Sequence, residues 1–110
     1  MVWIRVFSSE QEARQRVRDN VPQLLILAGI RICLVSYNKK FFAVQDSCTH
    51  NGEALSGGRI NYLGEIVCPW HGYRFDLMSG RACDSSCSDL KTYPVKVDET
   101  GLYVAIPDAI

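Results

Sequence analysis

The chain of 110 residues is poor in histidine, in unbalanced charge and in long apolar runs. Its 12 Lys plus Arg residues match its 12 Asp plus Glu residues, so the formal net charge is zero. A neutral chain has no basic field for nucleic acid or for an anionic membrane. The longest apolar run starts at Leu24, is broken by Gly29 and Arg31, and is far shorter than the about 20 residues of a membrane helix. We therefore expect neither nucleic acid nor a membrane as a partner.

The amino terminus lacks a basic and then apolar leader, which favours a cytoplasmic location. The chain has five cysteines, an odd number, and their spacing suggests no disulfide framework. This fits a reducing compartment, where disulfides are rare. Cys33 lies within an apolar run and is expected to be a small core residue. For Cys83 and Cys87 we expect free thiols rather than a bridge. A chain of this length with 47% hydrophobic residues predicts a single domain, residues 1–110.

Short alternating or apolar runs predict a succession of β-strands joined by tight turns. Ala28-Gly29 separates two such runs and is typical of a hairpin between two largely buried strands. Pro94 is suited to the edge of a sheet. The predicted strands span residues 2–7, 24–27, 30–35, 41–44, 59–63, 65–68, 73–75, 93–97 and 102–106.

Only one helix is expected, and it lies near the start of the chain. Ser9-Glu10-Gln11-Glu12 has the form of a capping box, and Ala13 and Val17 share one face, so the helix should run to about Asn20. About nine or ten strands against one helix predict an all-β fold, an antiparallel sandwich or a small barrel.

Both histidines follow a cysteine at short spacing, in Cys48-Thr49-His50 and in Cys68-Pro69-Trp70-His71. Two thiolates and two imidazoles suit zinc or an iron–sulfur cluster and do not suit magnesium or calcium. One interpretation is therefore a redox protein. The other is a zinc-stapled interaction module without a redox role.

The chain resembles Rieske-type [2Fe–2S] proteins over roughly residues 41 to 106, most strongly from Cys48 to Phe75. The two Cys/His pairs look like the two Rieske boxes. The resemblance implies one [2Fe–2S] cluster as cofactor, with one iron on Cys48 and Cys68 and the other, which takes the electron, on His50 and His71. It implies that the histidine rings are exposed. It also implies a rim around the cluster made of Trp70, Leu55 and residues 83–89.

The resemblance also implies a division of the domain. A cluster-binding subdomain, about residues 46–90, is inserted into a basal antiparallel β-sandwich made from about residues 1–45 and 91–110, whose two ends pair.

The residues around the second box indicate a branch of the family. The high-potential respiratory branch has a serine and a tyrosine where this chain has Tyr73 and Phe75, and a cysteine pair where it has Glu53 and Trp70. The chain instead resembles the ferredoxins and oxygenase components of bacterial ring-hydroxylating dioxygenase systems. Its reduction potential should lie toward the low end of about −150 to +300 mV.

The resemblance implies a soluble, monomeric electron carrier that passes single electrons from a reductase to a terminal oxygenase or another oxidoreductase. We expect no catalytic activity of its own, because the residues after Ile106 are too few for a catalytic domain. The alternative within the family is the small Rieske-like subunit of an assimilatory nitrite reductase.

Replacing Phe75 with Tyr should raise the reduction potential, because a hydroxyl hydrogen bond to the cluster stabilises its more negative, reduced state. Spectroelectrochemical titration of wild type and Phe75→Tyr checks this. An unchanged or lower potential would contradict the hydrogen-bond argument.

Overall fold

The computed structural model of the protein describes residues 1–84 and 87–108. Along these residues the chain forms ten strands, one α-helix and one short 3-10 helix. In chain order the elements are β1 (Val2–Phe7), α1 (Glu10–Arg16), β2 (Gln23–Leu27), β3 (Ile30–Tyr37), β4 (Lys40–Gln45), η1 (Leu55–Gly57), β5 (Arg59–Ile60), β6 (Glu65–Val67), β7 (Arg74–Asp76), β8 (Thr92–Tyr93), β9 (Val95–Asp98) and β10 (Gly101–Ile106).

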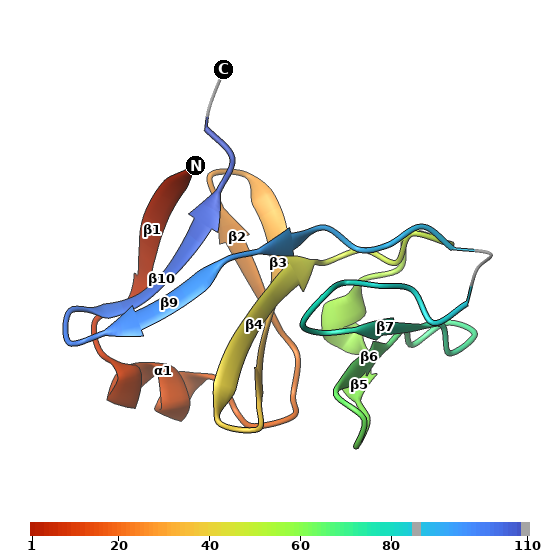
Figure 1. Cartoon of the computed structure of the whole chain (residues 1–110), viewed down its shortest axis with the longest axis horizontal. Helices are drawn as coiled ribbons and strands as arrows, with labels where there is room; N and C mark the ends of the chain where they lie inside the picture. Colours follow the sequence, from red (N-terminus) through yellow and green to blue (C-terminus); the bar gives the residue numbers. More distant parts are fainter. Residues whose placement is uncertain (85–86, 109–110) are drawn as a thin grey trace.

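The strands form three antiparallel sheets, with orders β1-β10-β9, β2-β3-β4-β8 and β5-β6-β7. The first two sheets lie together on one side of the molecule, and the third sheet with its loops projects from the other side (Figure 1). Because β1 pairs with β10 from Val2 opposite Ile106 onward, the expected pairing of the two chain ends is confirmed. The all-β class with a single α-helix is confirmed as well.

Strands β3 and β4 are buried on both faces of their sheet. Ile32 and Leu34 of β3 belong to a core shared with α1, β8 and β10. Cys33 and Val35, whose side chains alternate with those two, belong to a second core shared with the third sheet and its loops. The predicted core role of Cys33 is confirmed, since its side chain is fully buried. The middle sheet therefore separates two cores and supports the β5-β6-β7 sheet from behind.

Helix α1 begins as predicted and ends earlier than predicted. The Ser9 hydroxyl accepts a hydrogen bond from the Glu12 backbone N–H at 3.0 Å, as an N-cap should. The Glu12 carboxylate accepts from the Ser8 backbone N–H rather than from that of Ser9. Val17 already has extended backbone angles, so the predicted continuation to about Asn20 is wrong. Val17 is β-branched, and its side chain is buried in the core that β3 shares with α1, β8 and β10.

The hairpin at Ala28-Gly29 is confirmed, and both residues have positive φ, which matches the twist of the strands that they join. The prediction that both flanking strands are largely buried is wrong for β2. This strand lies at the edge of its sheet, and its side chains are only partly buried or exposed, with Ile26 59% exposed.

Of the predicted strands, one is divided into two and another ends early. The strand predicted over residues 93–97 is divided at Pro94 into β8 and β9, which belong to different sheets. Proline lacks the N–H that a continuous ladder would use at that point. The strand predicted over residues 59–63 ends at Ile60, because the Asn61 side chain accepts the backbone N–H groups of Leu63 and Glu65 and closes a turn.

Among the described residues, no helix has the length and apolar content needed to cross a bilayer.

Replacing Gly101 with Ala should strongly destabilise the fold, because Gly101 has φ +140 and an added Cβ would collide with the carbonyl oxygen of Phe7 on the neighbouring strand. We expect a loss of about 3 kcal/mol in the free energy of unfolding. Gly29→Ala is the matched control, since Gly29 also has positive φ and nothing lies within 4 Å of an added Cβ. It should cost about 1 kcal/mol. Urea unfolding followed by circular dichroism compares the two, and equal losses would refute the steric argument.

Candidate functional site

The first Cys/His pair lies on a tight loop that follows β4. The backbone N–H of Cys48 donates to the carbonyl of Glu53 at 2.8 Å, and the N–H of Gly52 donates back to the carbonyl of Cys48 at 2.7 Å. These bonds close the loop at its base. His50 is consequently held on an exposed tip, while Cys48 at the base is only 1% exposed.

The second pair lies on a loop of the same construction between β6 and β7. The backbone N–H of Cys68 donates to the carbonyl of Tyr73 at 2.7 Å, so here too a cysteine N–H bonds the residue five positions later. His71 and Gly72 at the tip both have positive φ, which reverses the chain within four residues. Cys68 is 2% exposed and His71 is exposed. Each loop thus buries its thiol and presents its imidazole to solvent.

The two thiols share the second core with apolar side chains. Cys48 and Cys68 pack there with the fully buried Leu55 and Phe75. Burial raises the pKa of the Cys68 thiol, and the neighbouring Cys48 side chain raises it further, whereas the Trp70 backbone lowers it. The two sulfurs therefore lie side by side in a low-dielectric setting. Leu55 was predicted to lie around the site, and it packs in the same core as the two thiols, fully buried rather than at the surface.

The two imidazoles have different neighbours. His50 stacks against Tyr73 with ring centroids 4.1 Å apart, and its Nε2 atom is hydrogen-bonded to the Tyr73 hydroxyl at 3.0 Å. His71 meets the edge of Trp70 at 5.3 Å, and Trp70 is itself 57% exposed. The expectation that both histidine rings reach the surface is confirmed, and Trp70, a predicted neighbour of the site, lies beside His71.

Side chains join the two loops to each other and to the segment that precedes β8. Asn51 of the first loop donates through Nδ2 to the Trp70 carbonyl of the second loop at 3.3 Å. Thr49 donates to the carbonyl of Ser88 at 2.6 Å, so residues around Ser88 adjoin the first loop as expected. The predicted rim also included Ser85 and Ser86, which lie outside the described residues.

A buried carboxylate anchors the first loop from below. Asp46 is 3% exposed and accepts hydrogen bonds from the Ser56 backbone N–H at 2.6 Å and the Ser56 hydroxyl at 3.1 Å. Arg31, on β3, lies 3.3 Å from the same carboxylate. A buried charge needs such partners. Asp46 thereby fixes η1 and the chain that enters the Cys48 loop to the middle sheet.

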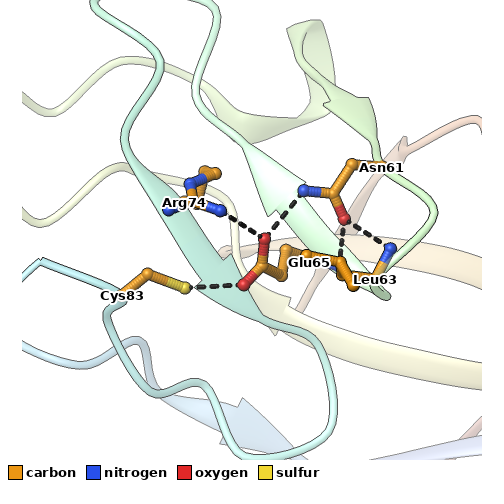
Figure 2. A network of polar contacts seen from close by, with 5 residues as sticks. All are labelled: Asn61, Leu63, Glu65, Arg74 and Cys83. Atoms are coloured by element: carbon orange, nitrogen blue, oxygen red, sulfur yellow. Dashed lines mark hydrogen bonds and ion pairs between the residues drawn. The ribbon is translucent and has the colours of Figure 1, made fainter.

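Beside the second loop, the Glu65 carboxylate accepts hydrogen bonds from three side chains, which converge on it in Figure 2. Asn61 donates at 2.7 Å, Arg74 at 3.0 Å and the Cys83 thiol at 2.9 Å. Cys83 is a free thiol, as expected. An open pocket next to this network is lined by His71, Gly72, Tyr73, Arg74, Cys83 and Asp84.

Three residues at the site were not expected from the sequence: Asp46, Asn51 and the Tyr73 hydroxyl that meets His50. A charged residue directly after an apolar strand was a signal for Asp46, because a carboxylate at that place must be either exposed or paired. The Asn51-Gly52 pair was a signal for a turn in which the asparagine side chain bonds the backbone. Nothing local could indicate that Tyr73 contacts a histidine 23 residues earlier.

Within the described part of the chain, no three His, Cys, Asp or Glu side chains were found grouped so as to hold a single metal ion. The donor set nevertheless fits a two-iron cluster. Two thiols lie together in apolar surroundings, and two imidazoles stand at the surface on the tips of the same loops. A cluster with two thiolates on one iron and two imidazoles on the other has this division of ligands.

Comparison with known proteins gives a consistent result. The family model described as the Rieske [2Fe-2S] domain matches residues 3–94. The 3-phenylpropionate/cinnamic acid dioxygenase ferredoxin subunit of Photorhabdus laumondii is 36% identical over 78 residues, which cover 70% of this chain and 74% of that protein.

Two solved structures are similar over almost the whole chain. The ferredoxin of carbazole 1,9a-dioxygenase from Nocardioides aromaticivorans is 27% identical with a TM-score of 0.80, and the match covers 96% of this chain and 98% of that one. A chain in a complex of reduced oxygenase and oxidized ferredoxin in carbazole 1,9a-dioxygenase is 26% identical with a TM-score of 0.79, covering 94% and 93%.

Replacing Glu65 with Gln should make Cys83 more reactive. Desolvation of the Cys83 sulfur and its hydrogen bond to the Glu65 carboxylate raise the pKa of this thiol to about 11. At a pH of about 8.5, the ordinary pKa of a thiol, little of it is therefore thiolate. Removing the negative charge lowers the pKa of Cys83 and should speed its alkylation severalfold. Iodoacetamide labelling with site-resolved mass spectrometry measures the rate.

Arg74→Gln is the opposite control for this experiment. The Arg74 charge lowers the pKa of Cys83, so its removal should slow alkylation. Cys33, whose pKa is raised to about 12 by burial, serves as an unreactive internal reference. Equal Cys83 rates in wild type and Glu65→Gln would show that the carboxylate does not control the thiol.

Proposed function

The chain belongs to the Rieske [2Fe–2S] domain family, and on this basis we propose that it is the electron-carrying ferredoxin component of a multicomponent dioxygenase. The observation that carries the proposal is the pair of matched loops, which set two buried thiols side by side and two imidazoles at the surface above them. An iron–sulfur cluster bound there supplies reversible uptake of one electron.

Cys48 and Cys68 would hold one iron of the cluster, and His50 and His71 would hold the other. Three features of the chain support this assignment. The thiols lie in an apolar core that excludes water, the Cys–N–H bonds fix each loop, and the Asp46 carboxylate anchors the first loop to the middle sheet. We also propose that residues of about 46–90 form the cluster-binding subdomain and that about 1–45 and 91–110 form its base, all within a single domain.

Electrons would enter and leave through the histidine side of the site. Both imidazoles are exposed, whereas the thiols are covered by the second core, so a partner can approach the histidines only. Trp70, more than half exposed next to His71, adds an apolar surface on which a partner can dock.

The relatives suggest which partners to expect. The similar carbazole dioxygenase ferredoxin is found in a complex with its oxygenase, and we propose an oxygenase as the electron acceptor here. A reductase is the corresponding donor, and the chain itself performs no further chemistry and acts as a monomer. We also propose a cytoplasmic location, in line with the odd number of cysteines, which suggests no disulfide framework.

Removing one thiol of the site should abolish the cluster. Cys68→Ala leaves one iron with a single protein thiolate, so the purified protein should lack the reddish-brown colour, the iron and the acid-labile sulfide of the wild type. Cys33→Ala is the matched control: its thiol lies in the same core, and the variant should keep the cluster. Metal analysis, sulfide assay and electron paramagnetic resonance of the reduced protein provide the readout.

A colourless wild-type protein with one zinc per chain would overturn this function and favour an interaction module. If iron and sulfide are present, stopped-flow reduction by a dioxygenase reductase and reoxidation by its oxygenase test the pathway. Reoxidation only by the catalytic subunit of a nitrite reductase would identify the family alternative instead.

A further inference from the structure

Asn51 is the one side chain among the described residues that touches the backbone of both cluster loops and a thiol of the site. Its Oδ1 atom accepts the backbone N–H of Glu53, in its own loop, at 2.9 Å. Its Nδ2 atom donates to the Trp70 carbonyl, in the other loop, at 3.3 Å. The same Nδ2 atom lies 3.8 Å from Cys68 Sγ.

The bond from Glu53 fixes which way the amide points. Since Oδ1 is engaged by a backbone N–H of its own loop, the two hydrogens of Nδ2 are directed across to the second loop. The Cys68 sulfur is 3.8 Å from Oδ1 as well, a contact that it makes only as a thiol donor. A metal-bound thiolate carries no proton, so only the contact with the Nδ2 donor remains attractive.

An N–H donor at a sulfur that binds the cluster raises the reduction potential. The sulfur carries more negative charge when the cluster is reduced, and a donor stabilises that charge. The surroundings make the effect larger, because Cys68 is 2% exposed and water does not compete for the sulfur.

We propose that Asn51 is a positioning residue for the cluster, which ties the two loops together and raises the reduction potential through its contact with Cys68 Sγ. This rests on the proposed function, since it requires that Cys68 binds the cluster. The two effects are separable: the link between the loops slows loss of the cluster, and the donor at sulfur makes the potential more positive.

Two substitutions test the proposal. Asn51→Leu has a similar volume and removes every polar contact. Asn51→Asp keeps an acceptor for the Glu53 N–H, loses both donor hydrogens and places a negative charge beside the sulfur. The reduction potential should therefore fall in the order wild type, Asn51→Leu, Asn51→Asp.

Asn61→Leu is the matched control. Asn61 bonds the backbone two residues ahead in the same way, through Oδ1 and the Leu63 N–H at 3.0 Å, in the loop between β5 and β6 (Figure 2). Its amide hydrogens are directed to Glu65 and not to a cysteine of the site. Asn61→Leu reports the cost of loosening a loop without changing the sulfur.

The measurements are the midpoint potential from spectroelectrochemistry and the rate at which the visible absorbance of the cluster is lost in air. We expect a threefold to tenfold weaker affinity for the electron in Asn51→Leu, where tenfold corresponds to about 59 mV for one electron. Loss of the cluster should be severalfold faster in both Asn51 variants. Failure of both to assemble a cluster, with Asn61→Leu assembling normally, is the extreme form of that loss and supports the proposal.

An unchanged potential in both Asn51 variants, or the same shift in Asn61→Leu, would overturn the inference. The outcome is distinct from failure of the proposed function, in which wild type itself holds no [2Fe–2S] cluster. Far-ultraviolet circular dichroism confirms that each variant has folded.

Discussion

Burial of β3 and β4 on both faces is the constraint on which the rest of the molecule depends. Alternate side chains enter two cores, one shared with the sheet of the chain ends and one shared with the β5-β6-β7 sheet. Because the second core also contains Cys48 and Cys68, the same packing that completes the fold brings the two thiols together. The thiols are thus packed against the middle sheet, and the two imidazoles stand at the surface.

The loops of the site are held by hydrogen bonds rather than by a covalent link. Asn51 bonds the backbone of Glu53 in the first loop and of Trp70 in the second loop. Tyr73 and His50 form a second link, and Thr49 ties the first loop to Ser88. Each such bond contributes about 1 kcal/mol. The arrangement keeps the loops together while no disulfide joins those two positions.

Local patterns predicted most of the elements, and their errors have identifiable causes. Hairpins with two-residue turns were located correctly because the turn residues and the alternation agree. The helix was predicted too long, since the apolar spacing of Ala13 and Val17 is satisfied equally by a helix that stops at Arg16 and an extended Val17. Leu55 was placed near the site from its proximity to a ligand loop, but that proximity does not reveal that its side chain is fully buried.

The sequence by itself determined the donor set and its spacing, because a cysteine and a histidine within one tight loop are brought together by local chain geometry. It also indicated the all-β class through period-two alternation. Only the tertiary structure decided which side chains join the two loops. Asn51 reaches Trp70 across 19 residues and Tyr73 reaches His50 across 23. Such contacts depend on how the third sheet packs against β3 and β4, and no local pattern contains that information.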